Sequence, residues 1–267
     1  MKNIIKLTKF NLYIHRKNII GWTIAITAIM ILYMSLFPSI KDIAQAELDA
    51  MPKEILQFMG MDKTTKLADY TSYYAMVYGI ILIPISIFAA TFSANQITKE
   101  EKTKVIEFLN GLAVSRKEIY ISKYITSLIA ISIVVVIANL APIICGNING
   151  GETFIADKII ESVKVTSFIP IFYGGIALAL ASFSSKTGSG AVASSVVVFT
   201  YMMGYLGELL VDKAAFLKDI SPFIIFSVNN ALNITDNVIF KLLVYIVIYI
   251  ICLICGKIIY QKRDFKI

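Results

Sequence analysis

The chain has 267 residues, of which 57% are hydrophobic and only 16% are charged, and its formal net charge is +7. This composition, with a mean hydropathy of +0.75, excludes an ordinary soluble domain and indicates an integral membrane protein. The positive charge does not require a nucleic-acid partner, because basic residues also set the orientation of membrane proteins.

Long apolar runs predict six transmembrane helices. Each run can cross a hydrocarbon core of about 30 Å as a helix of about 20 residues. The predicted spans cover about residues 19–38, 73–95, 123–145, 165–185, 188–208 and 238–260. We therefore predict an all-α integral membrane protein with a single transmembrane domain over residues 1–267. The apolar segment 221–232 is too short to cross, and we predict that it is interfacial or re-entrant.

The distribution of basic residues predicts the orientation. Segments 1–18, 95–123, 185–188 and 257–267 would share one side of the membrane, and they contain 16 of the 25 Lys and Arg residues. The other loops contain 13 of the 18 acidic residues. Because the side richer in Lys and Arg faces the cytosol, both termini and the segment 95–123 are predicted to be cytoplasmic.

Residues 1–18 have the pattern of an interfacial amphipathic helix. Ile4, Leu7, Phe10 and Ile14 share one helical face. The remaining positions include five basic residues, Lys2, Lys6, Lys9, Arg16 and Lys17. Such a helix lies at the membrane surface beside anionic head groups. A frayed basic terminus is the alternative. A cleavable signal peptide is disfavoured because the apolar run that follows is too long.

Two further patterns leave alternatives open. Residues 52–59, on the predicted outer side, form an amphipathic helix that could act as an interfacial lid or be a plain surface helix. Spans four and five are rich in small residues, which favour close helix packing. The sequence does not decide whether that packing lies within one chain or between two chains.

The charged segment 100–123 between spans two and three reads as two short helices. The first predicted helix covers residues 100–110. Its apolar side consists of Val105, Ile106, Phe108 and Leu109. Glu100 and Glu101 stand at its start, and Gly111 stands where it ends. Residues 115–118 then form a capping box, in which the Ser115 hydroxyl and the Glu118 carboxylate satisfy free backbone amides and begin the helix of span three.

This segment resembles the cytoplasmic segment between spans two and three of ABC-2 type transporter permeases. The matching residues are Ile106, Glu107, Phe108, Leu109, Val114, Ser115, Arg116, Glu118, Ile119 and Lys123. Weaker similarities are Trp22 early in the first span, residues 51–60, and a terminal Tyr-x-x-Arg-Asp at Tyr260, Arg263 and Asp264. Two departures are Ala113 in place of a Pro and Lys104-Val105 in place of a Gly-Thr, so the bend and the start of the helix can differ.

The resemblance implies that the chain is the permease of an ATP-driven exporter in a bacterial plasma membrane, with residues 100–110 as a coupling helix that docks on a separate ATPase. The implied coupling residues are Glu100, Glu101, Ile106, Glu107, Phe108, Leu109, Ser115, Arg116 and Glu118. ATP and Mg would bind to the ATPase, because this chain lacks a phosphate-binding loop with its Gly-x-x-x-x-Gly-Lys pattern. A second copy or a sister permease would complete the pathway. A non-transporting sensor or assembly subunit with the same fold is the alternative.

Other chemistry finds little support in the sequence. His15 is the only histidine, and Cys252 and Cys255 lie on an apolar helix without a charged neighbour, so no catalytic, metal or cofactor site is expected. The centres of the spans contain no ionisable residue, which disfavours a carrier driven by protons or ions. The residues that bind the substrate cannot be identified from these patterns.

Overall fold

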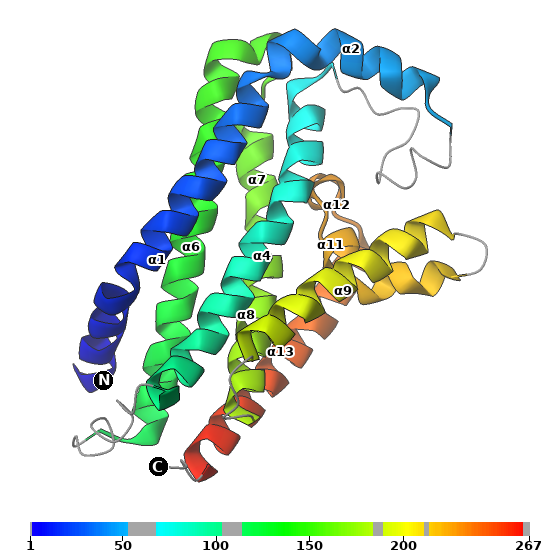
Figure 1. Cartoon of the computed structure of the whole chain (residues 1–267). Helices are drawn as coiled ribbons and strands as arrows, with labels where there is room; N and C mark the ends of the chain where they lie inside the picture. Colours follow the sequence, from blue (N-terminus) through cyan, green and yellow to red (C-terminus); the bar gives the residue numbers. More distant parts are fainter. Residues whose placement is uncertain (1, 53–67, 103–113, 184–188, 211–213, 264–267) are drawn as a thin grey trace.

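The structure, a computed structural model, describes residues 2–52, 68–102, 114–183, 189–210 and 214–263. These residues form helices and connecting turns without a strand. Six helices are long and apolar enough to cross a membrane, namely Asn3–Ser35, Tyr70–Thr98, Arg116–Asn149, Ala156–Phe183, Ser189–Leu209 and Asp236–Lys262. The predicted all-α fold with six spans is confirmed. Figure 1 shows both termini at the same end of the bundle, which we call the terminal end.

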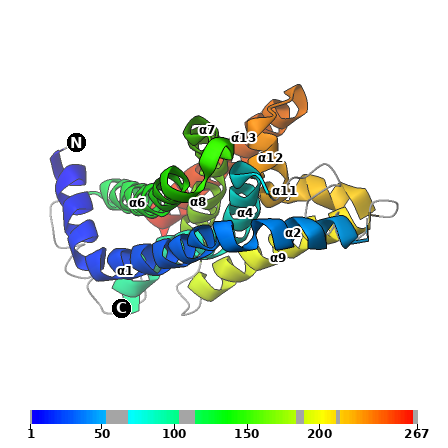
Figure 2. The same ribbon diagram turned by 90° about the horizontal axis from the view of Figure 1, so that it is seen from above.

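Helix α1 (Lys2–Ser35) joins the predicted interfacial helix and the first predicted span in one continuous helix. Seen from above, its amino-terminal part turns away from the remainder of α1 (Figure 2). Two polar residues of this part, Thr8 and Asn11, are buried against the bundle, whereas Phe10 and Ile14 are about half exposed. The amino-terminal part therefore contacts the bundle through a mixed face, which combines Thr8 and Asn11 with the partly buried Leu7 and Leu12. Its place at the membrane surface stays a prediction.

Helix α2 (Phe37–Ala50) was not predicted from the sequence. It runs across the end of the bundle opposite the termini (Figure 1). Its sequence is rich in Ala and contains no internal Gly, which favours a helix, and Pro38 lies in the first turn where Pro is tolerated. The amphipathic pattern predicted for residues 52–59 lies outside the described residues from position 53 onward.

Helices α4 (Tyr70–Lys102) and α6 (Arg116–Asn149) are the long central helices. Helix α4 packs against α1, α6, α8 and α9. We expected Glu100 to begin a separate coupling helix, but residues 100–102 form the last turn of α4 instead. The reason is local: residues 98–102 contain neither Gly nor Pro, and Glu and Lys are good helix formers. Residues 103–113, which hold the rest of the predicted coupling helix, lie outside the described residues.

The fourth span is built from two helices. A short 3₁₀ turn, η1 (Gly151–Thr153), leads into α7 (Ala156–Thr166), and α8 (Phe168–Phe183) follows after a break at Ser167. Pro170 explains the break, because it has no N–H to donate to the carbonyl of Thr166. The span thus begins nine residues earlier than the position 165 that we expected, since the apolar run underestimates a helix whose first turns are polar.

The chain then forms α9 (Ser189–Leu209), a return segment, and α13 (Asp236–Lys262). The return segment contains η2 (Ala215–Ile220) and the short helices α11 (Pro222–Ile225) and α12 (Val228–Leu232). It packs against α9, α7 and α4, and Phe223 and Phe226 are buried within it. As predicted, these residues do not form a span.

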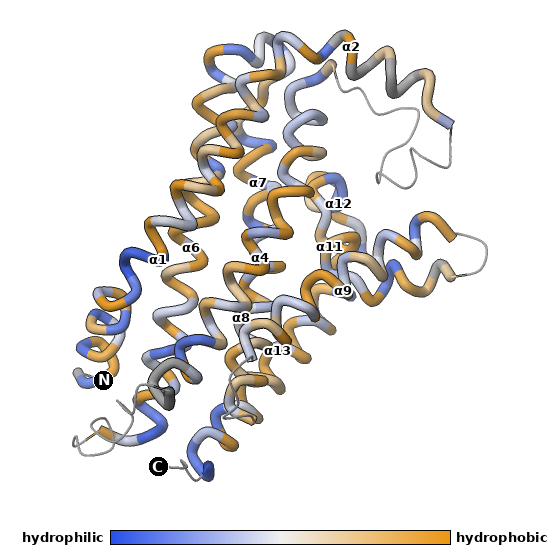
Figure 3. The backbone as a smooth tube through the Cα atoms, viewed as in Figure 1, coloured by the Kyte–Doolittle hydropathy of each residue, from blue (hydrophilic) through white to orange (hydrophobic). Residues whose placement is uncertain are grey.

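Close packing within the chain uses several of the small residues. A methyl group on Gly175 would lie 2.1 Å from Cε2 of Tyr249, and one on Gly174 would lie 2.7 Å from Cδ1 of Ile131. The glycines of α8 therefore let α13 and α6 approach it closely. Apolar residues follow the middle of the helices and hydrophilic residues gather at the terminal end (Figure 3).

Candidate functional site

The candidate site lies at the terminal end, where α6 begins and α8 and α13 end. We call it the helix-end junction and define it by Arg116, Tyr120, Lys123, Tyr260 and Arg263. The terminal parts of α6 and α13 lie at this end of the bundle in Figure 1. Helix ends leave backbone groups without partners, so any side chain that contacts them there fixes one helix relative to another.

The first element of the junction is the predicted capping box, which is confirmed. The backbone N–H of Glu118 donates to the Ser115 hydroxyl at 3.2 Å, and the Glu118 carboxylate accepts from the Ser115 backbone N–H at 3.0 Å. The same carboxylate accepts from the Ser115 hydroxyl at 3.1 Å. These bonds set the first residue of α6 and therefore the direction in which the chain arrives from residue 114.

Arg116 connects the start of α6 with the end of α13. Its Nη1 donates to the backbone oxygen of Arg263 at 2.6 Å and to that of Gln261 at 3.2 Å. Both acceptors belong to the carboxyl end of α13, where carbonyls lack helical partners and the helix dipole favours a positive charge. Arg116 and Arg263 are 147 positions apart in the sequence, so their contact joins distant parts of the chain.

Arg263 repeats this arrangement on the next helix. Its Nη1 donates to the backbone oxygens of Ala181 at 3.2 Å and Ser182 at 3.3 Å, which end α8. Arg116 and Arg263 together therefore link α6 to α13 and α13 to α8. We call this pair of contacts the arginine relay.

Aromatic packing supports the relay one turn deeper. The rings of Tyr120 and Tyr260 lie 5.7 Å apart, and both side chains are buried. The Tyr120 hydroxyl faces Gly256, where an added methyl group would lie 2.6 Å from it and 2.8 Å from Cα of Ala179. Helices α6, α8 and α13 are thus in close contact beneath the two arginines.

Lys123 joins the junction to α4. Its side chain is fully buried, and its Nζ donates to the backbone oxygen of Gln96. A buried ammonium group is costly unless it is hydrogen-bonded, so this contact fixes α6 against the last turns of α4. Helix α1 packs against α6 nearby: the buried Thr8 hydroxyl, which donates to the Ile4 oxygen at 2.9 Å, lies 3.5 Å from the Ser122 oxygen.

The predicted coupling residues divide into three groups. Ser115, Arg116 and Glu118 lie in the junction, with the contacts given above. Glu100 and Glu101 belong to the last turn of α4. The remaining residues, Ile106, Glu107, Phe108 and Leu109, lie outside the described residues. The contact between Arg116 and Arg263 was not predicted, although each residue belongs to a motif that was recognised separately in the sequence.

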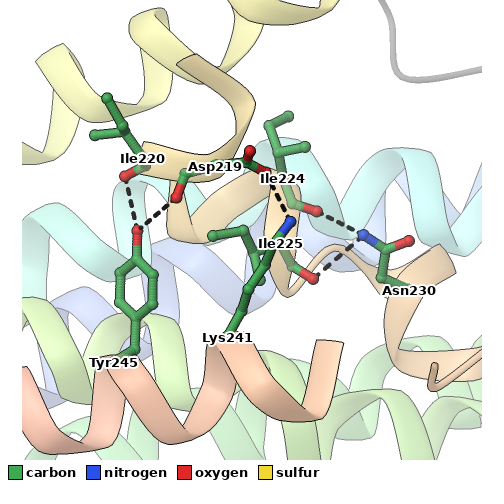
Figure 4. Close-up of polar contacts among 7 residues, drawn as sticks. All are labelled: Asp219, Ile220, Ile224, Ile225, Asn230, Lys241 and Tyr245. Carbon is green, nitrogen blue, oxygen red and sulfur yellow. Dashed lines mark hydrogen bonds and ion pairs between the residues drawn. The ribbon is translucent and has the colours of Figure 1, made fainter. Parts of the chain in front are cut away.

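The opposite end of α13 holds the return segment. Lys241 forms an ion pair with Asp219, with Nζ and Oδ1 2.7 Å apart, and one turn later the Tyr245 hydroxyl donates to the Ile220 oxygen at 2.9 Å. The Asn230 amide donates to the oxygens of Ile224 and Ile225 and closes the turn between α11 and α12. Figure 4 shows these contacts. Helix α13 therefore contacts the return segment at one end and the arginine relay at the other.

The three cysteines do not form disulfides in the structure. All three are free thiols, with Cys145 buried and Cys255 exposed. Within the part of the chain that the structure describes, no three His, Cys, Asp or Glu residues come together as metal ligands.

A comparison with protein families gives a match that includes the return segment and the junction residues Arg116, Tyr120, Lys123 and Tyr260. Residues 8–261 match the family described as "Multidrug efflux system permease Rv1217c, C-terminal domain". No curated protein matches the chain. Because the match extends over nearly the entire sequence, the chain belongs to this family of efflux permeases.

Proposed function

We propose that the chain is the permease subunit of an ATP-driven ABC exporter, of the ABC-2 type, in a bacterial plasma membrane. A separate ATPase subunit would bind ATP and Mg and dock on residues 100–123. Two permeases, either identical or sister chains, would enclose the pathway. The family's description as a multidrug efflux permease supports transport out of the cell and a small-molecule substrate.

The observation that carries this proposal is the arginine relay. A subunit driven from outside needs a firm connection between the docking segment and the helices that must move. Arg116 directly follows Ser115, the residue that caps α6, and it contacts the end of α13. Helix α13 in turn contacts α8 through Arg263. A force applied to the residues before position 114 would thus reach three helices at once. A loop that only reverses the chain direction does not require these contacts.

Co-purification with the cognate ATPase tests the proposal. The permease alone should not hydrolyse ATP, and the complex should contain two permease chains. If Glu101 forms a desolvated pair with the ATPase, Glu101→Ala should weaken docking by about 2–5 kcal/mol, and Phe108→Ala should also lower complex recovery. Glu152→Ala removes an exposed acid at the opposite end of the bundle and is the matched control.

Two results would overturn the proposal. One is ATP hydrolysis by the isolated, contaminant-free permease. The other is full complex recovery and transport by the Glu101 and Phe108 variants. A complex that regulates its ATPase without transporting any compound would instead favour the non-transporting assembly subunit.

The proposed orientation has a separate test. In a cysteine-free version, single cysteines at positions 2, 103 and 265 should be shielded from an impermeant thiol reagent in intact cells. Cysteines at positions 62 and 152 should react, because they lie in the proposed outer loops. Labelling at position 265 without labelling at position 2 would require an odd number of spans and would contradict the architecture.

A further inference from the structure

A polar cavity lies at the end of the bundle opposite the termini. It has a volume of about 310 Å³ and is bounded by the start of α4, η1, the start of α7 and the end of α12. Its lining residues are Asp69, Thr71, Ser72, Thr153, Ile155, Lys158, Asn229, Leu232 and Asn233. Most of them are charged or carry a hydroxyl or amide group. Neither the arginine relay nor the proposed docking segment involves this cavity.

The walls of the cavity are held by hydrogen bonds between elements. The Thr153 hydroxyl accepts from the backbone N–H of Tyr70 at 3.0 Å, and the Thr71 hydroxyl donates to the Thr153 oxygen at 3.2 Å. Helix α12 packs against both α7 and α4. The Asn233 amide donates to the Asn229 oxygen at 3.1 Å. The cavity is therefore formed by the fold itself and needs no ligand to shape it.

The cavity contains two opposite charges that do not neutralise each other. Asp69 lies just before α4, and Lys158 lies in the first turn of α7. Among the described residues, neither side chain forms an ion pair. Lys158 lies beside the amino end of α7, where the residue before the helix provides no side-chain cap. The cavity thus offers a bound group one cationic and one anionic side chain.

Apolar residues also line or adjoin the cavity, at the ends of helices that could cross a membrane. Tyr70, beside Asp69, begins the apolar part of α4 that could cross the membrane. Ile155 lines the cavity and is 42% exposed, and Ile148, close to the end of α6, is 75% exposed. A polar cavity with an exposed isoleucine in its wall is where a lipid would present its head group, with its acyl chains along the apolar helix surfaces.

We propose that this cavity binds the phosphoethanolamine head group of a membrane lipid. Lys158 would bind the phosphate, and Asp69, with the amide oxygens of the asparagines, would accept from the primary ammonium group. Phosphocholine carries the same charges, but its trimethylated nitrogen has no N–H to donate, so the site should discriminate between the two head groups. Phosphatidylglycerol has no ammonium group for Asp69.

The test is native mass spectrometry of the purified full-length chain with an equimolar mixture of phosphatidylethanolamine and phosphatidylcholine that carry the same acyl chains. We expect phosphatidylethanolamine to bind about tenfold more tightly, because phosphatidylcholine lacks one charge-assisted hydrogen bond to Asp69. Asp69→Leu, which leaves no acceptor at this position, should abolish the preference. Lys158→Gln should weaken the binding of both lipids alike, because both carry a phosphate. Asp157→Asn and Lys164→Gln are matched controls on α7 outside the cavity and should behave like the wild type.

The ratio of the two lipids is measured on the same folded molecules, so a variant with a low yield still gives a valid result. Equal binding of the two lipids to the wild type, or an equal loss of preference in Asp157→Asn, would overturn the proposal. Free glycerophosphoethanolamine is the test of the source. If it displaces phosphatidylethanolamine when both are at the same concentration, the site recognises the head group, and its natural ligand is a soluble molecule and not a membrane lipid. Lipid binding in this cavity does not depend on an ATPase. Loss of the lipid preference would therefore leave the proposed exporter function untouched, and the reverse also holds.

Discussion

The two ends of α13 are fastened in different ways. At the terminal end, Arg116 and Arg263 donate to backbone oxygens that end α13 and α8, and both arginines are partly buried. At the opposite end, Lys241 pairs with Asp219, whose side chain is 61% exposed. An exposed ion pair contributes little to stability, whereas hydrogen bonds from a charged group to partly buried backbone oxygens contribute more.

The return segment is held mainly by aromatic packing. The ring of Phe226 lies 5.5 Å from those of Phe168 and Tyr245, and the ring of Phe223 stacks on that of Tyr173 at the same distance. Apolar contacts of this kind tolerate small shifts, while the hydrogen bonds of an arginine to a helix end require one geometry. The terminal end is therefore held in one geometry, whereas the contacts at the opposite end tolerate small shifts. Four predictions test that difference, from the largest expected effect to the smallest.

Arg116→Ala should have the largest effect. It removes the charged donor from two carbonyls at the end of α13, which we expect to cost about 1.5–3 kcal/mol of stability. Thermal unfolding of the purified chain in detergent measures this loss. Lys117→Ala removes the same charge from the neighbouring exposed position and should be nearly neutral. Similar unfolding temperatures for the two variants would mean that the relay does not hold the helices together.

Gly256→Val should cause the second-largest loss of stability. The added side chain would collide with the Tyr120 hydroxyl and with Ala179, so α13 would have to move away at an expected cost of about 1–3 kcal/mol. A double-mutant cycle with Tyr120→Phe checks the cause, because loss of the hydroxyl should recover part of the stability. A Gly256→Val variant as stable as the wild type would contradict the close packing of α13 on α6 and α8.

Ser115→Ala should cost about 1 kcal/mol, the usual effect of losing a helix cap. The measured quantity is again the unfolding temperature, together with recovery of the ATPase complex. Ser167→Ala is a matched control, because that hydroxyl is exposed and donates only to the Lys164 oxygen of its own helix. The account of the capping box is contradicted if Ser167→Ala destabilises the chain more than Ser115→Ala does.

Asp219→Asn should have the smallest effect, below about 1 kcal/mol, because the ion pair with Lys241 is exposed. Raising the salt concentration should reduce the difference from the wild type further, since salt screens exposed charges. Unfolding temperatures at low and high salt check both statements. A large effect that is insensitive to salt would show that the two ends of α13 are fastened equally firmly.

The features that could be predicted from the sequence are those with local causes. Apolar runs predicted the six helices, because a helix needs about 20 apolar residues to cross a bilayer. The Ser-x-x-Glu pattern at Ser115 predicted the capping box, which depends on residues three positions apart. The position of the break in the fourth span was missed, although Pro170 offered a signal, because a proline can also lie within a straight helix, as Pro84 does.

Contacts between distant residues could not be predicted in this way. The hydrogen bond from Arg116 to Arg263 joins residues 147 positions apart, and a single sequence contains no pattern that pairs them. The same holds for Asp69 and Lys158, which line one cavity because α12 packs against both α4 and α7. Helix α2 was missed for a different reason, since charged and small residues after an apolar run are equally typical of a loop.

The most direct test of the central proposal measures transport per ATP hydrolysed by the complete complex. Wild type, Arg116→Ala and Lys117→Ala would be reconstituted with the cognate ATPase, and ATP hydrolysis and export of a fluorescent drug that the wild type transports would be followed in the same vesicles. The account predicts that Arg116→Ala still assembles and hydrolyses ATP but exports about tenfold less drug per ATP, while Lys117→Ala matches the wild type. An Arg116→Ala complex with the wild-type ratio of transport to hydrolysis would contradict the role of the arginine relay in coupling.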